Sequence, residues 1–273
     1  MARATAAVAF PGVRWSNAMV SPLGQRKGLV VGIANDRSIA WACARAFREA
    51  GAELAATWQD ERARPHVEPL LESLGIDLRL PLDVADDAQL QAVFEAIARR
   101  WGRLDFLLHS VAFAPRADLH GRVVDSSREG FAQAMDLSCH SFLRMARLAE
   151  PLMRDGGSLL TLSYLGAGEV VPDYGLMGPV KAALEACVRY LAVELGPAGI
   201  RVNAVSPGAI PTRAASGIGG FDALVADQLA RSPIRTPLSI GDIAPLCAFL
   251  AGDGARAITG TTLYVDGGYH LLN

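Results

Sequence analysis

Two tyrosines and a lysine stand close together near the middle of the sequence. In residues 163–181 (SYLGAGEVVPDYGLMGPVK), Tyr164 and Tyr174 are ten positions apart and Lys181 follows seven later. On a helix, a spacing of seven is close to two turns, so Tyr174 and Lys181 would point the same way. A lysine beside a tyrosine favours the phenolate and can hold ribose hydroxyls. Phenol and ammonium together can stabilise negative charge that develops on a substrate oxygen.

The same residue types also have a plainer interpretation. An isolated Tyr/Lys pair is often a buried tyrosine with a satisfied hydroxyl and a lysine at the surface. The position of Tyr164 favours chemistry, because it stands at the end of the apolar run GSLLTLSYL (residues 157–165), which is typical of a buried strand. In parallel sheets, ligands bind beyond the carboxyl ends of the strands.

The elements that would position these groups alternate along the chain. Strand-like runs at residues 27–34, 53–58, 78–84, 104–112, 157–165, 200–208 and 261–268 are separated by helical segments at residues 38–52, 65–75, 88–102, 131–153 and 183–196. This alternation predicts an α/β fold, a doubly wound parallel sheet of the Rossmann type with about seven strands and helices on both faces. Apolar strands buried on both sides agree with it.

Domain organisation follows from the same pattern. No repeat or linker interrupts residues 25–273, which are predicted to form one dinucleotide-binding and catalytic domain. Residues 1–24 contain no acidic residue, and we interpret them as a flexible N-terminal extension. A true start at Met19 or a weak secretory signal are the alternatives.

Composition excludes several classes of function. The formal net charge of −2 shows no excess of basic residues of the kind that binds nucleic acid. The four cysteines are scattered without metal-ligand spacing, which predicts free thiols in a reducing cytoplasm and no metal site. No apolar run approaches the ~18 residues that a membrane span requires.

The first strand ends in a glycine turn, VVGIANDRSIAWA, that could hold a phosphate. Gly32 is the one early glycine, and Ser38 and Ile39 begin the next helix. A helix N-terminus offers unpaired N–H groups and partial positive charge, which suit a pyrophosphate. The turn is not GxGxxG, so an ordinary strand–turn–helix connection is nearly as good an interpretation.

Three later strand ends would complete a dinucleotide site. Gln59 stands where such folds often place an acidic residue on the ribose 2′-hydroxyl, and an amide can bond a hydroxyl but cannot neutralise a phosphate. This favours NADH, while the nearby Arg62 and Arg64 keep NADPH open. Further predicted neighbours of the adenosine are Asp83, Val84 and Val111, although Asp83 could equally be a turn residue.

At this point the sequence resembles a known family, the NADH-dependent enoyl-acyl-carrier-protein reductases, a branch of the short-chain dehydrogenase/reductases. The resemblance covers residues 25–269 and rests on GIANDRSIAWA, ATWQ, LDV, HSVAFAP, LTLSYLGA, SPGAIPTRAASGI and ITGTTLYVDGG together with the Tyr174, Met177 and Lys181 set. Ordinary members of the superfamily carry Tyr-x3-Lys with a serine thirteen positions before the tyrosine. Here the spacing is Tyr-x6-Lys, and Thr161 occupies the serine position.

The resemblance implies an activity and a role for each matching residue. The chain would transfer hydride from NADH to the β-carbon of a trans-2-enoyl thioester on acyl-carrier protein, in fatty-acid synthesis. Tyr174 would bond the thioester carbonyl, Lys181 would hold the nicotinamide ribose, and Tyr164 would position substrate. The resemblance also implies pyrophosphate contacts at Gly32, Ser38 and Ile39, a nicotinamide cover formed by Ile210, Pro211, Thr212, Arg213 and Ala214, and substrate contacts at Ala114 and Met177.

The resemblance further implies a homotetramer and a mobile flap at residues 212–226, over an acyl slot that Met177, Ile218 and Phe221 would partly line. Pro179 departs from the family pattern and predicts a kink if the helix begins near Tyr174. Two other functions remain as alternatives. One is a short-chain dehydrogenase for a ketone or alcohol, and the other is a catalytically silent NAD-binding regulatory protein.

Overall fold

A single parallel sheet organises the described part of the chain. The structure is a computed structural model, and it describes residues 21–212, 215–217 and 219–272. Within these residues the sheet has seven strands in the order β3-β2-β1-β4-β5-β6-β7, and each neighbouring pair is parallel. The strands are β1 (Lys27–Val31), β2 (Glu53–Trp58), β3 (Leu78–Pro81), β4 (Phe106–His109), β5 (Gly157–Leu162), β6 (Ile200–Pro207) and β7 (Thr262–Val265). The predicted doubly wound fold is confirmed, with the strand order reversing between β1 and β4.

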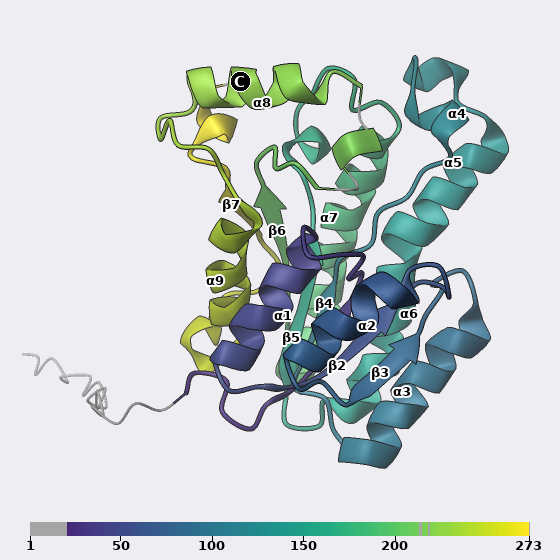
Figure 1. Cartoon of the computed structure of the whole chain (residues 1–273), viewed down its shortest axis with the longest axis vertical. Helices are drawn as coiled ribbons and strands as arrows, with labels where there is room; N and C mark the ends of the chain where they lie inside the picture. Colours follow the sequence, from purple (N-terminus) through teal and green to yellow (C-terminus); the bar gives the residue numbers. More distant parts are fainter. Residues whose placement is uncertain (1–20, 213–214, 218, 273) are drawn as a thin grey trace, which may run out of the picture.

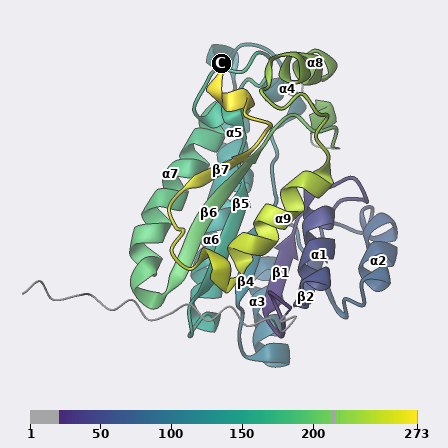
Figure 2. The same ribbon diagram turned by 90° about the vertical axis from the view of Figure 1, so that its left-hand side faces the viewer.

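Helices cover both faces of this sheet. On one face lie α1 (Ile39–Glu49), α2 (Arg64–Ser73) and α9 (Ile240–Ala251), and on the other lie α3 (Asp87–Trp101), α6 (Ser141–Ala149) and α7 (Met177–Leu195) (Figures 1 and 2). Successive strand residues alternate between the two layers. Leu107 and Leu159 pack with α3, α6 and α7, while Leu108 and Leu160 pack with α1 and α9. Burial on both sides explains why the strands read as continuous apolar runs.

Side-chain caps fix the start of α3 and α9, among other helices. The Asp86 carboxylate accepts hydrogen bonds from the Ala88 N–H at 2.8 Å and the Gln89 N–H at 3.1 Å, so Asp86 is the N-cap of α3. Ser239 and Asp242 form a capping box at the start of α9. Helix α9 was not among the predicted helices, although Ser239-x-x-Asp242 is a pattern that indicates a helix start.

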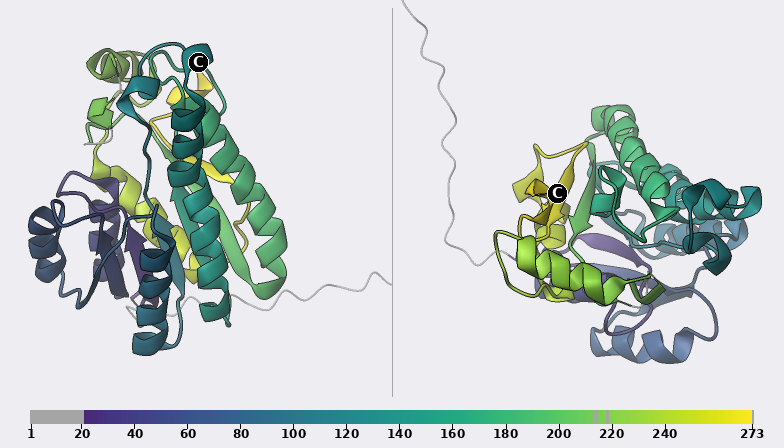
Figure 3. Two further views of the ribbon diagram at one scale, coloured as in Figure 1. Left: turned by 90° about the vertical axis from the view of Figure 1, so that its right-hand side faces the viewer. Right: turned by 90° about the horizontal axis from the view of Figure 1, so that it is seen from above.

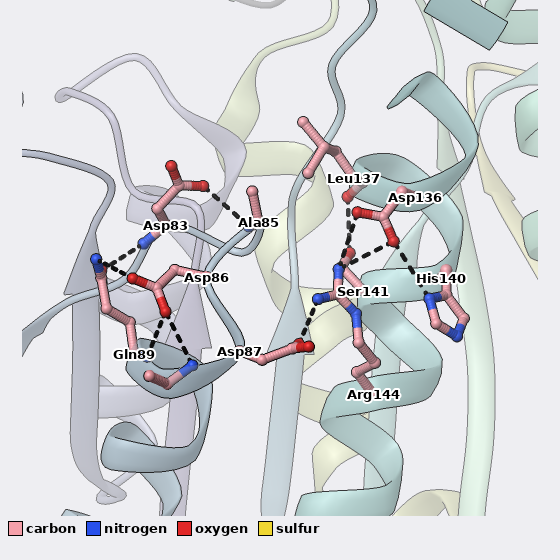
Figure 4. A network of polar contacts seen from close by, with 11 residues as sticks. Asp83, Ala85, Asp86, Asp87, Gln89, Asp136, Leu137, His140, Ser141 and Arg144 are labelled. Carbon is pink, nitrogen blue, oxygen red and sulfur yellow. Dashed lines mark hydrogen bonds and ion pairs between the residues drawn. The ribbon is translucent and has the colours of Figure 1, made fainter. Parts of the chain in front are cut away.

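The long helix predicted at residues 131–153 is interrupted by a wider turn. It consists of α5 (Arg128–Met135), the π-helical turn η2 (Asp136–His140), α6 and the short 3₁₀ turn η3 (Glu150–Leu152). Arg144 holds this turn to the start of α3, because its guanidinium contacts Asp87 at 2.7 Å and Asp136 at 3.3 Å (Figure 4). Such π turns occur often at functional sites.

A group of short elements lies beyond the carboxyl ends of the strands. It includes α4 (Arg116–Leu119) and α8 (Phe221–Arg231), with the turn η6 (Ala215–Gly217) beside them, and α8 crosses the top of the molecule in Figures 1 and 3. The remaining 3₁₀ turns are η1 (Val123–Asp125), η4 (Leu165–Ala167), η5 (Gly196–Ala198), η7 (Asp253–Ala255) and η8 (Tyr269–Leu271).

The packed part of the chain begins before Gln25. Leu23 is fully buried, and its N–H donates to the carbonyl of Ala50 at the end of α1. Packing therefore reaches into the segment predicted to be an extension, whose residues 1–20 lie outside the described residues.

Candidate active site

The two tyrosines meet at the carboxyl edge of the sheet. Tyr164 is extended and stands two residues after β5, and its ring centroid lies 4.7 Å from that of Tyr174. Gly166 makes this approach possible, since a Cβ at this position would lie 2.3 Å from Cδ1 of Tyr174. Gly166 is a positioning residue that the sequence analysis missed, although it lies within the SYLGA stretch.

Tyr174 does not belong to the helix that carries Lys181. Helix α7 begins at Met177, and Tyr174 precedes it in a turn, so the prediction that both side chains share one helical face is wrong. Asp173 has a positive φ of 61°, and Gly175 has a φ of 53°. These left-handed residues redirect the backbone on both sides of Tyr174.

Pro179 lies in the first turn of α7. Its missing N–H would have had no partner within the helix, because N–H groups in the first turn have none. The helix continues unbroken from Met177 to Leu195. The conditional prediction of a kink therefore does not apply, since the helix begins three residues after Tyr174.

Lys181 is buried, with 4% of its surface exposed. Its ammonium donates a hydrogen bond to the carbonyl of Leu162, the last residue of β5, at 2.7 Å. The interpretation as a surface lysine is therefore excluded. Burial lowers the pKa of Lys181 to about 8, and the Cys139 and Glu185 side chains partly oppose this shift. The ammonium therefore lies at the end of β5, and Tyr164 follows Leu162 by two residues.

Both phenols are held in the protonated form. Burial, and then the Tyr164 side chain, raises the pKa of Tyr174, and burial also raises that of Tyr164. The prediction that a neighbouring lysine favours the phenolate is wrong, because desolvation by burial is the largest influence on the pKa of both phenols. Among the described residues neither hydroxyl has a hydrogen-bond partner. Tyr174 can therefore donate a hydrogen bond to a ligand oxygen.

The glycine turn brings the end of β1 close to the end of β4 and leads into an open helix N-terminus. Gly32 has a φ of +103°, and a Cβ there would lie 2.0 Å from the carbonyl oxygen of Ser110. Ser38 occupies the N-cap position of α1 without bonding the helix N–H groups, and the first turn holds no acidic residue. The N-terminus of α1, at Ile39, is therefore open to an anion, which fits a pyrophosphate.

A cavity of about 810 Å³ connects this turn with the elements above the sheet. It is lined by Ala34, Asn35, Arg37, His66, Pro211, Thr212 and Phe221, among others. Gly220 also lines it, and a Cβ there would lie 3.0 Å from Oδ2 of Asp173, the neighbour of Tyr174. Cavities of this size, which join a helix N-terminus to the top of a parallel sheet, are typical ligand sites.

The predicted adenosine residues divide into exposed and buried groups. Gln59 is exposed at the end of β2, whereas Val84 is buried and Val111 is partly buried in one apolar cluster at the same edge. Asp83 accepts a hydrogen bond from the Ala85 N–H at 2.9 Å, so its carboxylate already makes a turn. Arg64 is engaged by Glu68, with Nε and Oε2 3.0 Å apart.

The predicted nicotinamide cover is only partly described. Ile210 is buried, Pro211 is exposed, and Thr212 Oγ1 accepts a hydrogen bond from the Ala215 N–H at 3.2 Å. Arg213, Ala214 and Ile218 lie outside the described residues. Within the predicted flap, residues 221–226 belong to helix α8. Of the predicted substrate residues, Met177 is buried and Ala114 is partly buried, and both lie in the cluster that contains the tyrosines.

Gln228 is a second positioning residue that the sequence analysis missed. It is buried on α8, and its Oε1 accepts a hydrogen bond from the Ala209 N–H at 2.6 Å. Gly208 permits this contact, since a Cβ there would lie 2.4 Å from the same oxygen. Gln228 thus fixes the segment that leads from β6 into residues 210–212. No sequence motif marks a lone glutamine of this kind.

Thr161 takes no part in the surface that faces the tyrosines. It is fully buried, and its hydroxyl contacts His109 Nδ1 at 2.9 Å, while Ser141 Oγ contacts Nε2 at 2.8 Å. Burial lowers the pKa of His109 to about 3, so the imidazole is neutral. Thr161, which occupies the position of the superfamily's serine, therefore packs β5 against β4 here.

Two further observations concern ligands and membranes. Within residues 21–212, 215–217 and 219–272, no group of three His, Cys, Asp or Glu side chains is arranged to hold a metal ion. In the same residues, no helix combines the length and apolar character needed to cross a membrane.

A doubly wound sheet with a glycine turn before an open helix N-terminus and a buried Tyr/Lys pair at its carboxyl edge is the arrangement typical of a dinucleotide-dependent oxidoreductase. A model of the enoyl-(acyl carrier protein) reductase family matches residues 32–270. The chain belongs to this family, and the resemblance seen in the sequence is confirmed.

Relatives and solved structures agree with this assignment. The chain is 47% identical over 247 residues to an NADH-type enoyl-acyl-carrier-protein reductase of Rhizobium meliloti, covering 90% of this chain and 91% of the relative. An enzyme of Anaplasma phagocytophilum, solved with NAD, shares 46% identity with a TM-score of 0.89, over 92% of this chain and 96% of that one. An enzyme of Bacillus cereus, solved with NADP+ and an indole naphthyridinone, shares 43% identity with a TM-score of 0.90, over 92% and 99%.

Proposed function

We propose that this chain reduces the carbon–carbon double bond of a trans-2-enoyl thioester on acyl-carrier protein, using NADH, in fatty-acid synthesis. One observation carries the proposal. A protonated phenol, Tyr174, and a buried ammonium, Lys181, lie beside the end of β5, where a parallel sheet binds its ligands. Membership of the enoyl reductase family supplies the type of reaction.

The residues of the chain act on the substrate oxygen and on the position of the cofactor. When bound, NADH supplies a hydride to the β-carbon of the substrate. Tyr174 donates a hydrogen bond to the thioester carbonyl and stabilises the negative charge that develops there. Because burial keeps Tyr174 protonated, the donor is in place before charge appears. Tyr164 packs on Tyr174 and positions the substrate, and Lys181 holds the nicotinamide ribose.

The cofactor site that we propose follows the carboxyl edge of the sheet. Its pyrophosphate would lie at Gly32, Ser38 and Ile39, where the first turn of α1 holds no acidic residue and the helix dipole is favourable. Gln59, Asp83, Val84 and Val111 would flank the adenosine, and Ile210, Pro211, Thr212, Arg213 and Ala214 would cover the nicotinamide. Ala114 and Met177 would contact the acyl thioester. The exposed amide of Gln59 suits a 2′-hydroxyl, which favours NADH over NADPH.

We further propose a homotetramer in the cytoplasm, with residues 25–273 as the catalytic domain. Two large apolar side chains on α7 support an assembly surface, since Tyr190 is 72% exposed and Val193 is 78% exposed. Light scattering on the purified chain tests this, and a monomeric mass would contradict it.

The reaction is tested by absorbance of the reduced nicotinamide. Purified protein is mixed with a 2-enoyl thioester of acyl-carrier protein or coenzyme A, and NADH and NADPH are supplied in separate runs. We expect NADH to be consumed only with the enoyl substrate. Consumption with a 3-ketoacyl thioester instead would indicate the ketone dehydrogenase. NADH binding without turnover on either substrate would indicate the silent regulatory protein.

A further inference from the structure

The four cysteines form two pairs that differ in their surroundings. Cys139 in η2 and Cys187 on α7 are in hydrogen-bond contact, with their sulfur atoms 3.7 Å apart. Cys43 on α1 and Cys247 on α9 form the second pair, on the opposite face of the sheet. All four are free thiols. The widely spaced positions in the sequence give no sign of either pair.

The first pair has the chemistry of a reactive dithiol, and the second does not. Cys43 and Cys247 are both 0% exposed, and the contact between them together with burial raises the pKa of Cys43 well above its usual value. Cys187, in contrast, is partly exposed in the single chain, on the side of α7 that faces η2, whereas the two apolar side chains of the proposed assembly surface project into solvent. The hydrogen bond between the two thiols lowers the pKa of Cys187 and raises that of Cys139, which favours Cys187 as the thiolate of the pair.

The reactive pair joins two elements that support the active site. Cys187 follows Lys181 on the same helix. On the other side, Ser138 precedes Cys139, and its hydroxyl holds both the N–H and the carbonyl of Phe113 at 2.8 Å. Phe113 is the neighbour of Ala114, a proposed substrate contact. A movement of either sulfur is therefore transmitted toward Lys181 or toward the loop after β4.

We propose that Cys139 and Cys187 are a site of reversible oxidation, at which a peroxide converts the two thiols into a disulfide that slows the reductase. The Cys187 thiolate attacks one peroxide oxygen and becomes a sulfenic acid, and the other oxygen leaves as hydroxide, which takes a proton to form water. Cys139 then attacks the sulfenic sulfur. The S–S bond forms, hydroxide leaves and takes the Cys139 proton, and a second water is released. Two thiols lose two electrons, and the peroxide is reduced to two waters.

The expected loss of activity follows from geometry. The sulfur atoms must approach from 3.7 Å to the bonded distance of about 2.05 Å. The helix that carries Lys181 and the turn that carries Ser138 must therefore shift relative to each other. This consequence rests on the proposed function, whereas formation of the bond does not.

The test uses the reduced full chain with hydrogen peroxide as the probe. After treatment, free thiols are alkylated, the protein is digested without reductant, and the peptides are mapped by mass spectrometry. We expect a linked peptide that contains Cys139 and Cys187, while Cys43 and Cys247 in the same sample remain alkylated. NADH-dependent turnover should fall several-fold and return after treatment with a thiol reductant.

Two variants separate the disulfide from general damage. Cys187→Ser and Cys139→Ser should each retain turnover before treatment. After peroxide, neither variant should form a linked peptide or show a loss of turnover that a thiol reductant restores. The proposal is overturned if the linked peptide is absent in the wild type, or if the Cys187→Ser protein shows the same reversible loss. Turnover of the untreated wild type reports on the proposed function independently, so failure of one proposal is distinguishable from failure of the other.

Discussion

Both ends of the sheet carry a cavity and polar side chains, but the two ends differ in whether those side chains have partners within the chain. At the amino ends of the strands, a cavity of about 480 Å³ is lined by Lys27, Arg48, Glu53 and Trp101, among others. Glu53 accepts hydrogen bonds from the Lys27 ammonium and from Trp101 Nε1, and Arg48 donates to the Ala52 carbonyl at 2.6 Å. Each of these charges already has a partner within the chain.

At the carboxyl ends of the strands, the two tyrosine hydroxyls have no such partners among the described residues. Tyr164 and Tyr174 are desolvated, and their hydroxyls bond no described residue, while the start of α1 has no side-chain cap bond. The comparison teaches that Lys27, Arg48 and Glu53 at the amino edge are paired within the chain, whereas the two phenols and the start of α1 at the carboxyl edge are left open to a ligand.

The largest effect is expected for Tyr174→Phe. The change removes the hydrogen-bond donor and leaves the ring packed on Tyr164 and Gly166. We expect kcat/KM for the enoyl thioester to fall about 10²- to 10³-fold, as for the loss of one positioned donor. Steady-state kinetics and thermal unfolding measure the two consequences, and the unfolding temperature should hardly change. Near-normal turnover in this variant would remove Tyr174 from the proposed chemistry.

A smaller effect on the same edge is expected for Lys181→Met. The substitution keeps most of the buried stem and removes the ammonium that bonds the Leu162 carbonyl. A charged hydrogen bond to the cofactor ribose would be lost, and the dissociation constant for NADH should rise about 10- to 100-fold. Fluorescence titration with NADH measures it. An unchanged dissociation constant would exclude Lys181 as a cofactor ligand.

The pH dependence of NADH binding follows from the same lysine. Its pKa in the free protein is lowered to about 8 by burial. NADH binds the protonated form of Lys181. The affinity for NADH is therefore highest below pH 8 and weakens as the pH rises through this value. Titrations from pH 6.5 to 9.5 should show this decline in the wild type and a flat profile in Lys181→Met. A flat wild-type profile would contradict the prediction.

The smallest effect on activity is expected at the amino edge, with Glu53→Gln. Its side chain is 43% exposed, so its pair with Lys27 is partly screened and the loss of stability should be about 1 kcal/mol. The hydrogen bond from Lys27 lowers the pKa of Glu53. The stabilisation is therefore present above the ordinary pKa of a glutamate and is lost as the pH falls through the lowered value. Denaturant unfolding checks the stability, and kcat/KM should remain that of the wild type.

The fold could be predicted from sequence wherever burial was uniform. Strands such as β4 and β5 are apolar on both faces, and Asp86 marks the start of α3 in the sequence as it does in the structure. Helix α9 escaped prediction because its apolar residues surround most of the helix, which hides any periodicity. Its capping box was the remaining signal.

The candidate site was predicted in its residue types and less well in its geometry. Tyr174 and Lys181 were found by spacing, but the spacing suggested one helix, and the backbone instead turns at Asp173 and Gly175. The protonated state of Tyr174 depends on desolvation by residues distant in the sequence, which no local pattern reveals. The same holds for Gln228 and for the contact between Cys139 and Cys187.

The most direct test of the account follows a labelled hydride. NADH that carries deuterium at the transferable position is incubated with the protein and a 2-enoyl thioester, and the saturated product is examined by NMR. The account predicts deuterium at the β-carbon and a solvent proton at the α-carbon, because Tyr174 stabilises charge on the carbonyl oxygen while hydride reaches the far carbon. Deuterium on the carbonyl carbon, or no labelled product, would contradict the assignment of the carboxyl edge as an enoyl reductase site.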